Sequence, residues 1–218
     1  MSMIKKQANQ KGFTLIELLM VVLLLSIVVG AVFSQIERAQ VRYKVEDQRT
    51  DLTQQEREFI DQFTRDLHQT GYPSVSMFAP GVAANSVAAG LLSLTANDVI
   101  MEGDVDGDGV VETVEYSYFD GSVWAGPGPN PCPCIRRSSL AKGAAGPATN
   151  FTQVQNVIGA AFFTAFDKNG NTIPLPAVDP SKVRSIQITL TTQGISNDND
   201  SHQSIQVTMT GMARLVNN

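Results

Sequence analysis

The chain has a long apolar run near its N-terminus. Residues 13–33 read FTLIELLMVVLLLSIVVGAVF, which is 21 residues with a single ionisable side chain, Glu17. As a helix this run would be about 31 Å long, close to the roughly 30 Å hydrocarbon core of a bilayer. The pattern therefore predicts a transmembrane helix over residues 13–33.

A polar but still helical pattern follows the apolar run. Residues 34–70 contain neither proline nor glycine, and a set of large apolar side chains recurs among them at helical spacing. The members of this stripe are Leu52, Phe59, Ile60, Phe63 and Leu67. Gly71 suits a helix C-terminal cap, and Pro73 cannot continue a helix. We expect one continuous helix over residues 13–70, whose second part, within residues 34–72, forms a stalk laid against a head.

Beyond Pro73 the pattern changes to short apolar runs separated by turn residues, as is typical of β structure. The predicted strands cover residues 110–119, 157–166, 183–191 and 204–215. Apolar and polar residues alternate well in the last two, and the polar segment between them predicts a terminal antiparallel hairpin. A helix packed on an antiparallel β-sheet is an α+β fold, so residues 73–218 are expected to form a β-rich globular head.

Charge predicts how the chain is oriented in a membrane. With 43% hydrophobic and 17% charged residues, the composition is that of a folded protein. Lys5, Lys6 and Lys11 precede the apolar run, so the positive-inside rule leaves the N-terminus in the cytoplasm and the head outside. A secretory signal is disfavoured, because the run is too long and no small-x-small cleavage site follows it. The net charge of −5 argues against nucleic-acid binding, whose affinity comes mainly from phosphate neutralisation.

The junction between the basic leader and the apolar run carries a short motif. Residues 11–17 read KGFTLIE, and this arrangement resembles the prepilin peptidase site of type IV pilins and type II secretion pseudopilins. The resemblance implies a leader peptide at residues 1–12, cleavage after Gly12 by prepilin peptidase, N-methylation of Phe13 and an internal acid at Glu17. It also implies a single-pass inner-membrane precursor with its head in the periplasm or outside. Other pilin subunits would bind its N-terminal helix in a pilus or pseudopilus.

The physical chemistry of Glu17 agrees with an assembly role. A carboxylate near the start of a membrane helix costs several kcal/mol unless it meets a partner. The freed amine at Phe13 of a neighbouring subunit would supply one and would set the axial register between subunits. The alternative is that Glu17 reaches the lipid head groups or is protonated. Gly12 likewise has two interpretations, a small residue that lets the peptidase approach or a helix breaker before the membrane.

Two further stretches resemble the minor pilins of the PilW class. One is QQEREFIDQFTRDLHQTGYP at the passage from stalk to head, and the other comprises VRSIQITLTTQ and the ending RLVNN. The resemblance implies a minor pilin (PilW-like) of a type IV pilus, placed in the tip or priming complex. The rival interpretation within the same architecture is a minor pseudopilin of a type II secretion system.

An acidic stretch in the head has the spacing of a calcium loop. Asp104, Asp106, Asp108, Gly109 and Glu115 match the pattern D-x-D-x-D-G-x₅-E. The residues after Gly109 look like a strand, however, and an extended chain would carry Glu115 about 20 Å away. We therefore expect Asp104, Asp106, Asp108 and Glu112 as the candidate ligands of a structural Ca²⁺. The alternative is an acidic turn in which aspartates and glycines suit the backbone.

The two cysteines lie in a proline-rich stretch that reads GPGPNPCPCIRR. Outside the cytoplasm such a pair favours a disulfide between Cys132 and Cys134, although the ring would be small and strained. A redox site or a metal site is the alternative, but two thiolates alone lack further ligands. Arg136 and Arg137 follow after Ile135, and they are expected either to contact a partner or to be solvated.

No catalytic motif emerges from the sequence. The chain has two histidines, His68 and His202, and neither lies in a recognisable nucleophile or zinc motif. We therefore expect no enzymatic activity, no small-molecule substrate and no cofactor apart from the possible structural Ca²⁺. A last alternative is a membrane-tethered, calcium-dependent binding module that never enters a filament.

Overall fold

A single long helix, α1, begins the described structure. The computed structural model describes residues 12–78, 81, 83–121, 133–145, 148–197 and 204–216. Helix α1 spans Leu15–Gln69, 55 residues in all, and so begins two residues later than the sequence predicts. Residues 1–44 and residues 45–218 form two compact units, and α1 contributes to both.

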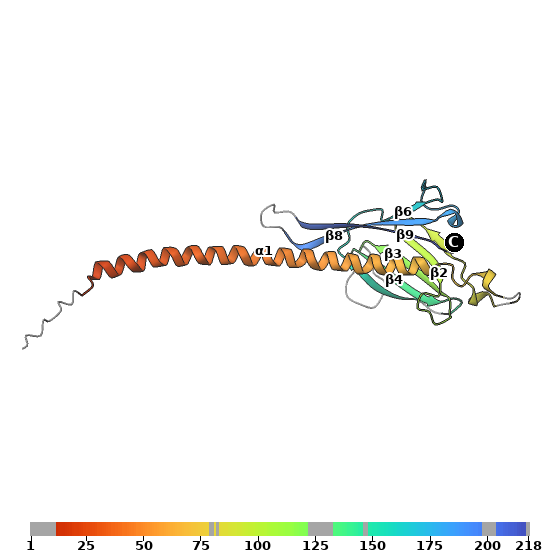
Figure 1. The fold of residues 1–218 in the computed structure, drawn as a ribbon, viewed down its shortest axis with the longest axis horizontal. Coiled ribbons are helices and arrows are strands. Elements are labelled where there is room, and N and C mark those ends of the chain that lie inside the picture. The colour runs from red at the N-terminus through yellow and green to blue at the C-terminus, as the bar shows by residue number, and fades with distance from the viewer. Residues whose placement is uncertain are drawn as a thin grey trace, which may run out of the picture. The chain divides into compact units, whose positions relative to one another are not determined.

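The second unit contains two antiparallel sheets (Figure 1). The five-stranded sheet has the order β1-β2-β3-β4-β5. Its strands are β1 (Leu91–Leu94), β2 (Asp98–Gly103), β3 (Glu112–Phe119), β4 (Cys134–Ala141) and β5 (Thr149–Gln155). The four-stranded sheet has the order β7-β6-β8-β9. Its strands are β6 (Phe163–Phe166), β7 (Thr172–Ile173), β8 (Ser185–Asn197) and β9 (Ser204–Arg214).

The α+β class is confirmed, and the sheet is divided in two. Three short 3₁₀ turns, η1 (Val75–Met77), η2 (Ala84–Ser86) and η3 (Pro180–Lys182), lie in the connections. The predicted terminal hairpin is present as β8 and β9, which pair antiparallel from Ser185↔Arg214 onward. Strands β1, β2, β4, β5 and β7 were not predicted, because their short or polar sequences lack a clean alternation.

The predicted strand over residues 157–166 is wrong in its first half. Only β6, at Phe163–Phe166, belongs to a sheet ladder. Val157 instead makes an isolated bridge with Thr192 of β8. The backbone N–H groups of Phe162 and Phe163 both donate to the carbonyl of Ala96, which ties this stretch to the other sheet. The apolar run therefore passes from one sheet to the other instead of forming one strand.

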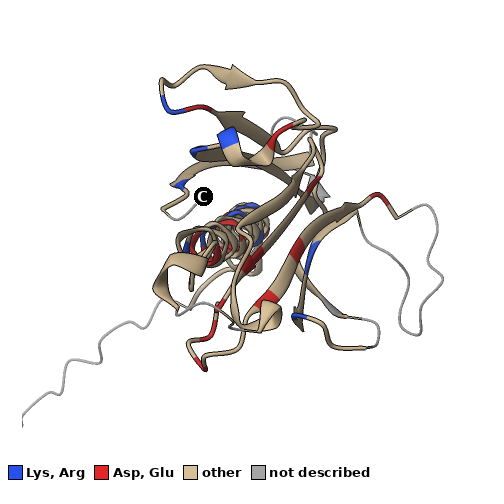
Figure 2. Ribbon diagram, turned by 90° about the vertical axis from the view of Figure 1, so that its right-hand side faces the viewer, with Lys and Arg blue, Asp and Glu red and all other residues tan. Residues whose placement is uncertain are grey.

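Within the second unit, the C-terminal part of α1 packs between the two sheets (Figure 2). Phe63 joins all three layers, because its ring lies 5.1 Å from that of Tyr116 on β3 and 5.5 Å from that of Phe163 on β6. Phe59 adds an edge-to-face contact with Tyr116 at 5.8 Å. Such ring pairs contribute about 0.5–1.5 kcal/mol each beyond the area that they bury. The predicted apolar stripe of α1 is thus the centre of the core, with Leu67 also buried.

A buried charged cluster fixes α1 to the five-stranded sheet. Asp66 is 1% exposed, and its Oδ2 accepts hydrogen bonds of 2.7 Å from the Tyr116 hydroxyl and from Nε of Arg137. Its Oδ1 accepts a third bond of 2.7 Å from the amide of Gln62. Burial disfavours the charged guanidinium, but the bond to Asp66 and its negative charge outweigh this and raise the pKa of Arg137. Burial and the same carboxylate raise the pKa of Tyr116.

A second buried carboxylate lies between α1 and the four-stranded sheet. Glu56 is fully buried, and its Oε1 accepts a 2.8 Å bond from the Thr192 hydroxyl on β8. Its Oε2 is buried with no hydrogen-bond partner among the described residues. Desolvation raises the pKa of Glu56, and the bonds from Thr192 offset this only in part. Unlike Asp66, Glu56 therefore has no cation to balance its charge among the hydrogen bonds and ion pairs that the structure shows for it.

Two glycines allow α1 to lie unusually close to the sheets. A Cβ at Gly211 of β9 would come within 2.5 Å of the side chain of Ile60. A Cβ at Gly103, the last residue of β2, would come within 2.5 Å of the carbonyl oxygen of Gln69. Neither position has room for a side chain, so α1 can pack this closely on the two sheets only if both residues are glycine.

We predict that Asp66→Ala strongly destabilises the head. Removing this carboxylate leaves the Arg137 guanidinium buried without its partner, which should lower the free energy of unfolding by about 3–5 kcal/mol. Chemical denaturation of the detergent-solubilised chain, followed by near-UV circular dichroism, measures it. Asp61→Ala, an exposed acid on the same helix, is the control and should change the value by no more than about 0.5 kcal/mol. Equal effects of the two variants would contradict the role given to Asp66.

We predict that Glu56 makes the head less stable as the pH rises. Its pKa is raised in the folded state, so between the ordinary value and the raised value the folded chain holds more protons than the unfolded chain, and stability falls with pH. Glu56→Gln removes this pH-dependent contribution to stability and keeps an acceptor for the Thr192 hydroxyl. The variant should therefore gain stability relative to the parent from about pH 4.5 upward, whereas Glu58→Gln, exposed on the same helix, should not. A pH-independent difference for Glu56→Gln would refute the assignment.

Candidate functional site

The predicted cleavage site lies just outside the start of α1. Gly12, Phe13 and Thr14 are not helical, and the Phe13 side chain is 81% exposed. The Thr14 carbonyl accepts bonds of 3.1 Å from the N–H of Glu17 and 3.2 Å from that of Leu18, which starts the helix. The peptide bond between Gly12 and Phe13 is therefore in non-helical backbone, the form in which a peptidase can bind it. Residues 1–11 of the predicted leader lie outside the described residues.

Nothing in the described structure requires glycine at position 12. A Cβ built there meets no atom within 4 Å, and its backbone is not in the left-handed region that favours glycine. Neither crowding nor backbone strain therefore explains the residue. Its interpretation as the small residue that a peptidase needs stays a prediction, with a helix breaker as the alternative.

Glu17 occupies a helix-capping position that the sequence analysis missed. Thr14 is the N-cap, and its hydroxyl accepts a 3.4 Å bond from the backbone N–H of Glu17. The Thr-x-x-Glu spacing is that of a capping box and was visible in the sequence. An acid in the first turn gains about 0.3–1 kcal/mol from the helix dipole. A carboxylate at the centre of a membrane helix costs about 2.5–3.5 kcal/mol, which is more than capping returns, and Glu17 lies at the third residue of α1.

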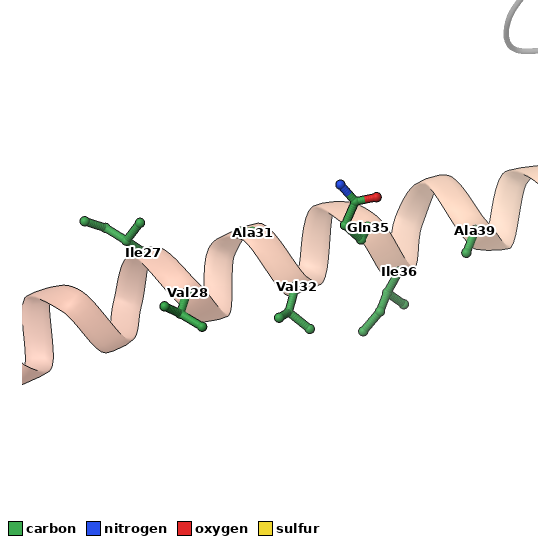
Figure 3. Close-up of a pocket in the computed structure, with 7 residues that line it drawn as sticks. All are labelled: Ile27, Val28, Ala31, Val32, Gln35, Ile36 and Ala39. Carbon is green, nitrogen blue, oxygen red and sulfur yellow. The ribbon is translucent and has the colours of Figure 1, made fainter.

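The N-terminal part of α1 has no cover within its own unit. The helix is long enough and apolar enough here to cross a membrane. No side chain of its most apolar 18-residue window is buried. Val28, Val32 and Ile36 project from the same side of the helix, with no other element beside them in Figure 3. An exposed apolar surface of this length requires lipid or other helices around it.

The acidic loop between β2 and β3 brings three carboxylates together. Asp104, Asp106 and Asp108 each place an oxygen within 4.8 Å of the others. The backbone is wrapped around them: Asp104 accepts from the N–H groups of Gly107 at 2.8 Å and Gly109 at 3.0 Å. These bonds fold the loop so that the carboxylates converge. Oxygens of this kind are the ligands that Ca²⁺ prefers, so the loop can hold such an ion.

The two glutamates that follow have different positions. Glu112 begins β3, and its Oε2 accepts a 3.1 Å bond from the N–H of Val105 in the loop. Burial, and then the negative charges of the three aspartates, raise the pKa of Glu112. Glu115 lies within β3, opposite Ile100 of β2, as the strand-like sequence predicts. The set within 4.8 Å comprises the aspartates alone, and calcium binding stays a prediction.

The cysteine and arginine predictions have mixed outcomes. Cys134 is not in a loop but is the buried first residue of β4. Cys132 lies outside the described residues, so the predicted disulfide stays a prediction. The expectation that the arginines are either solvated or contact a partner is wrong for Arg137, which is paired with Asp66. Arg136 lies over the ring of Phe119 at 4.3 Å.

Comparison with known families agrees with the N-terminal geometry. Residues 7–33 match the model of the prokaryotic N-terminal methylation motif. No curated protein and no solved structure matches the chain significantly. The motif covers the predicted cleavage site and the apolar part of α1, and it indicates a type IV pilin-like or pseudopilin precursor. Such a precursor is a structural subunit that prepilin peptidase processes and that assembles with other pilins.

We predict how calcium affects the stability of the head. If the acidic loop binds Ca²⁺, millimolar CaCl₂ should raise the melting temperature, because a ligand at 100 times its Kd adds about 2.7 kcal/mol. The double variant Asp106→Asn, Asp108→Asn should lose that response and the parent should lose it in EDTA. Differential scanning calorimetry of the detergent-solubilised chain measures it. An unchanged melting temperature of the parent would identify the loop as an acidic turn.

Proposed function

We propose that the chain is a minor pilin of the PilW class that assembles into the tip or priming complex of a type IV pilus. It is inserted as a precursor, cut between Gly12 and Phe13, methylated at Phe13 and then packed into the filament through α1. The methylation motif supports the processing steps. The PilW assignment rests on the resemblance of the stalk-to-head passage and of the β8–β9 region.

The observation that carries the proposal is the uncovered apolar part of α1. Its side chains are exposed along the whole membrane-length window, so the precursor needs lipid and the mature subunit needs other helices. Gly30 lies near the C-terminal end of this part, and a Cβ there would meet nothing within 4 Å. A glycine inside a helix costs about 1 kcal/mol relative to alanine. Close approach of a neighbouring helix would explain it, since small residues let helix backbones meet.

Assembly also gives Glu17 the partner that its own subunit does not supply. Capping returns only about 0.3–1 kcal/mol, less than a carboxylate costs at the centre of a membrane helix. Cleavage creates a new amine at Phe13, two residues before α1 begins at Leu15. In a bundle, the amine of one subunit would neutralise Glu17 of the next and fix their axial offset.

We predict that the mature protein begins at a methylated Phe13 and that Glu17→Ala prevents its incorporation. The variant should still be processed and remain in the membrane fraction, while the sheared filament fraction loses it at least about tenfold, the effect of 1.4 kcal/mol. Mass spectrometry of the N-terminus and immunoblots of the two fractions measure these outcomes. Glu37→Ala, an exposed acid farther along α1, should be incorporated normally.

Other results would identify the alternatives. If loss of the chain's function abolishes protein secretion but leaves pili intact, the chain is a type II secretion pseudopilin. Full function of Glu17→Ala together with loss of function in Asp106→Asn would indicate a membrane-tethered, calcium-dependent binding module. An unprocessed N-terminus would overturn the pilin assignment altogether.

A further inference from the structure

The segment that follows α1 exposes large apolar side chains at one end of the head. Residues 72–78 lie beyond the C-terminal end of α1, in yellow in Figure 1. Four of their side chains are well exposed: Tyr72 at 45%, Val75 at 73%, Met77 at 56% and Phe78 at 40%. Residues 71–97 contain no Asp, Glu, Lys, Arg or His. Several exposed apolar side chains close together on a folded domain indicate an interaction site.

The backbone of this segment is held in place by hydrogen bonds to the rest of the head. The N–H of Gly71 donates to the carbonyl of Glu102 at 2.8 Å, and the N–H of Ala88 donates to the carbonyl of Pro73 at 2.9 Å. Within the segment, the N–H of Met77 donates to the carbonyl of Ser74 at 3.0 Å to close the turn η1. The apolar side chains are thus presented on an ordered backbone. A surface ordered in advance loses less entropy when a partner binds.

The acidic loop is joined directly to this apolar segment. The N–H of Asp104 donates to the carbonyl of Tyr72 at 2.9 Å. With its amide turned so that the nitrogen faces these acceptors, Gln69 at the end of α1 donates to the carbonyls of Asp104 at 2.9 Å and Val105 at 2.7 Å. Asp106 and Asp108 of the loop are exposed, and so is Val110 at 44%. One end of the head therefore combines an exposed apolar segment with a flank of negative charge.

We propose that residues 72–78 and the acidic loop form a docking surface for another protein, whose apolar groove is rimmed by lysine or arginine side chains. The exposed apolar side chains would enter the groove, and Asp106 and Asp108 would meet the basic rim. The charge decides against a membrane as the occupant, because anionic head groups repel an acidic flank. This surface goes beyond the proposed function, since it involves neither α1 packing nor N-terminal processing.

Site-specific photocrosslinking tests the proposal in cells that express the full chain. A benzophenone side chain replaces Val75 or Met77. Matched controls replace Val178 and Met212, which are exposed apolar residues elsewhere on the head at 99% and 60%. Positions 75 and 77 should yield one discrete protein adduct that the control positions lack. The peptide mapped by mass spectrometry should carry apolar residues next to lysine or arginine.

Binding of the purified partner to the detergent-solubilised chain, in EDTA, then separates the two parts of the surface. The double variant Met77→Ser, Phe78→Ser should weaken binding about thirtyfold, as expected for a large apolar anchor. Asp106→Asn with Asp108→Asn should weaken it about threefold to tenfold and reduce its salt dependence. Asp51→Asn with Asp61→Asn, exposed on α1, should leave it unchanged. Melting temperatures of all variants exclude unfolding as the cause.

Several results would overturn the proposal. These are equal crosslinking at all four positions, adducts with lipid, adducts with a second copy of this chain, or no adduct at positions 75 and 77. A mapped peptide without basic residues, or binding that is insensitive to the Met77 and Phe78 changes, would do the same. The processing and incorporation assays are read separately, so failure of this surface is distinguishable from failure of the pilin assignment.

Discussion

The head depends on the burial of one carboxylate at the boundary between helix and sheet. A buried charge is tolerated only when donors surround it, and Asp66 meets Tyr116, Arg137 and Gln62 at 2.7 Å each. Tyr116 and Arg137 face each other across β3 and β4, so the cluster requires both strands and the helix in a single register. A shift of either strand by one residue would leave a buried charge without a partner. The cluster therefore specifies where α1 lies on this sheet, in addition to any stability that it adds.

The contact of α1 with the other sheet is built differently. Glu56 accepts a single side-chain hydrogen bond, from Thr192, and its other oxygen has no partner among the described residues. Its burial therefore destabilises the packing of α1 on the four-stranded sheet. Adhesion on this side must come from apolar packing, chiefly Phe63 on Phe163 and Ile60 over Gly211. Apolar contacts are less directional than charge-assisted hydrogen bonds. The same helix thus has one side whose register is fixed by charge and one side held by close packing.

The sequence predicts much of this fold, but it does not predict strands whose polar residues make them look exposed. The spacing of Phe59, Phe63 and Leu67 predicts the buried stripe, and the alternation in residues 183–215 predicts the terminal hairpin, because burial imposes those periods. Strand β4 escapes prediction because Arg136 and Arg137 look solvated in sequence. Arg137 is drawn partly into the head by Asp66, which is distant in the chain, and no local pattern contains that pairing. The aspartate spacing likewise predicts the convergence of the acidic loop, while the Thr14–Glu17 cap was readable and was missed.

Exposed apolar residues raise the reverse difficulty, since a sequence pattern does not tell which apolar segments the fold will cover. Phe59 and Phe78 are the same residue type, yet one is 1% exposed and the other 40%. The difference arises because Phe59 lies on the helix face enclosed by both sheets, whereas Phe78 follows a turn whose backbone bonds are satisfied locally. These backbone hydrogen bonds hold the turn at the surface, and its side chains remain outside. Single exposed apolar residues are ordinary on a folded surface, so this segment is distinguished by several such side chains that follow one another on an ordered backbone.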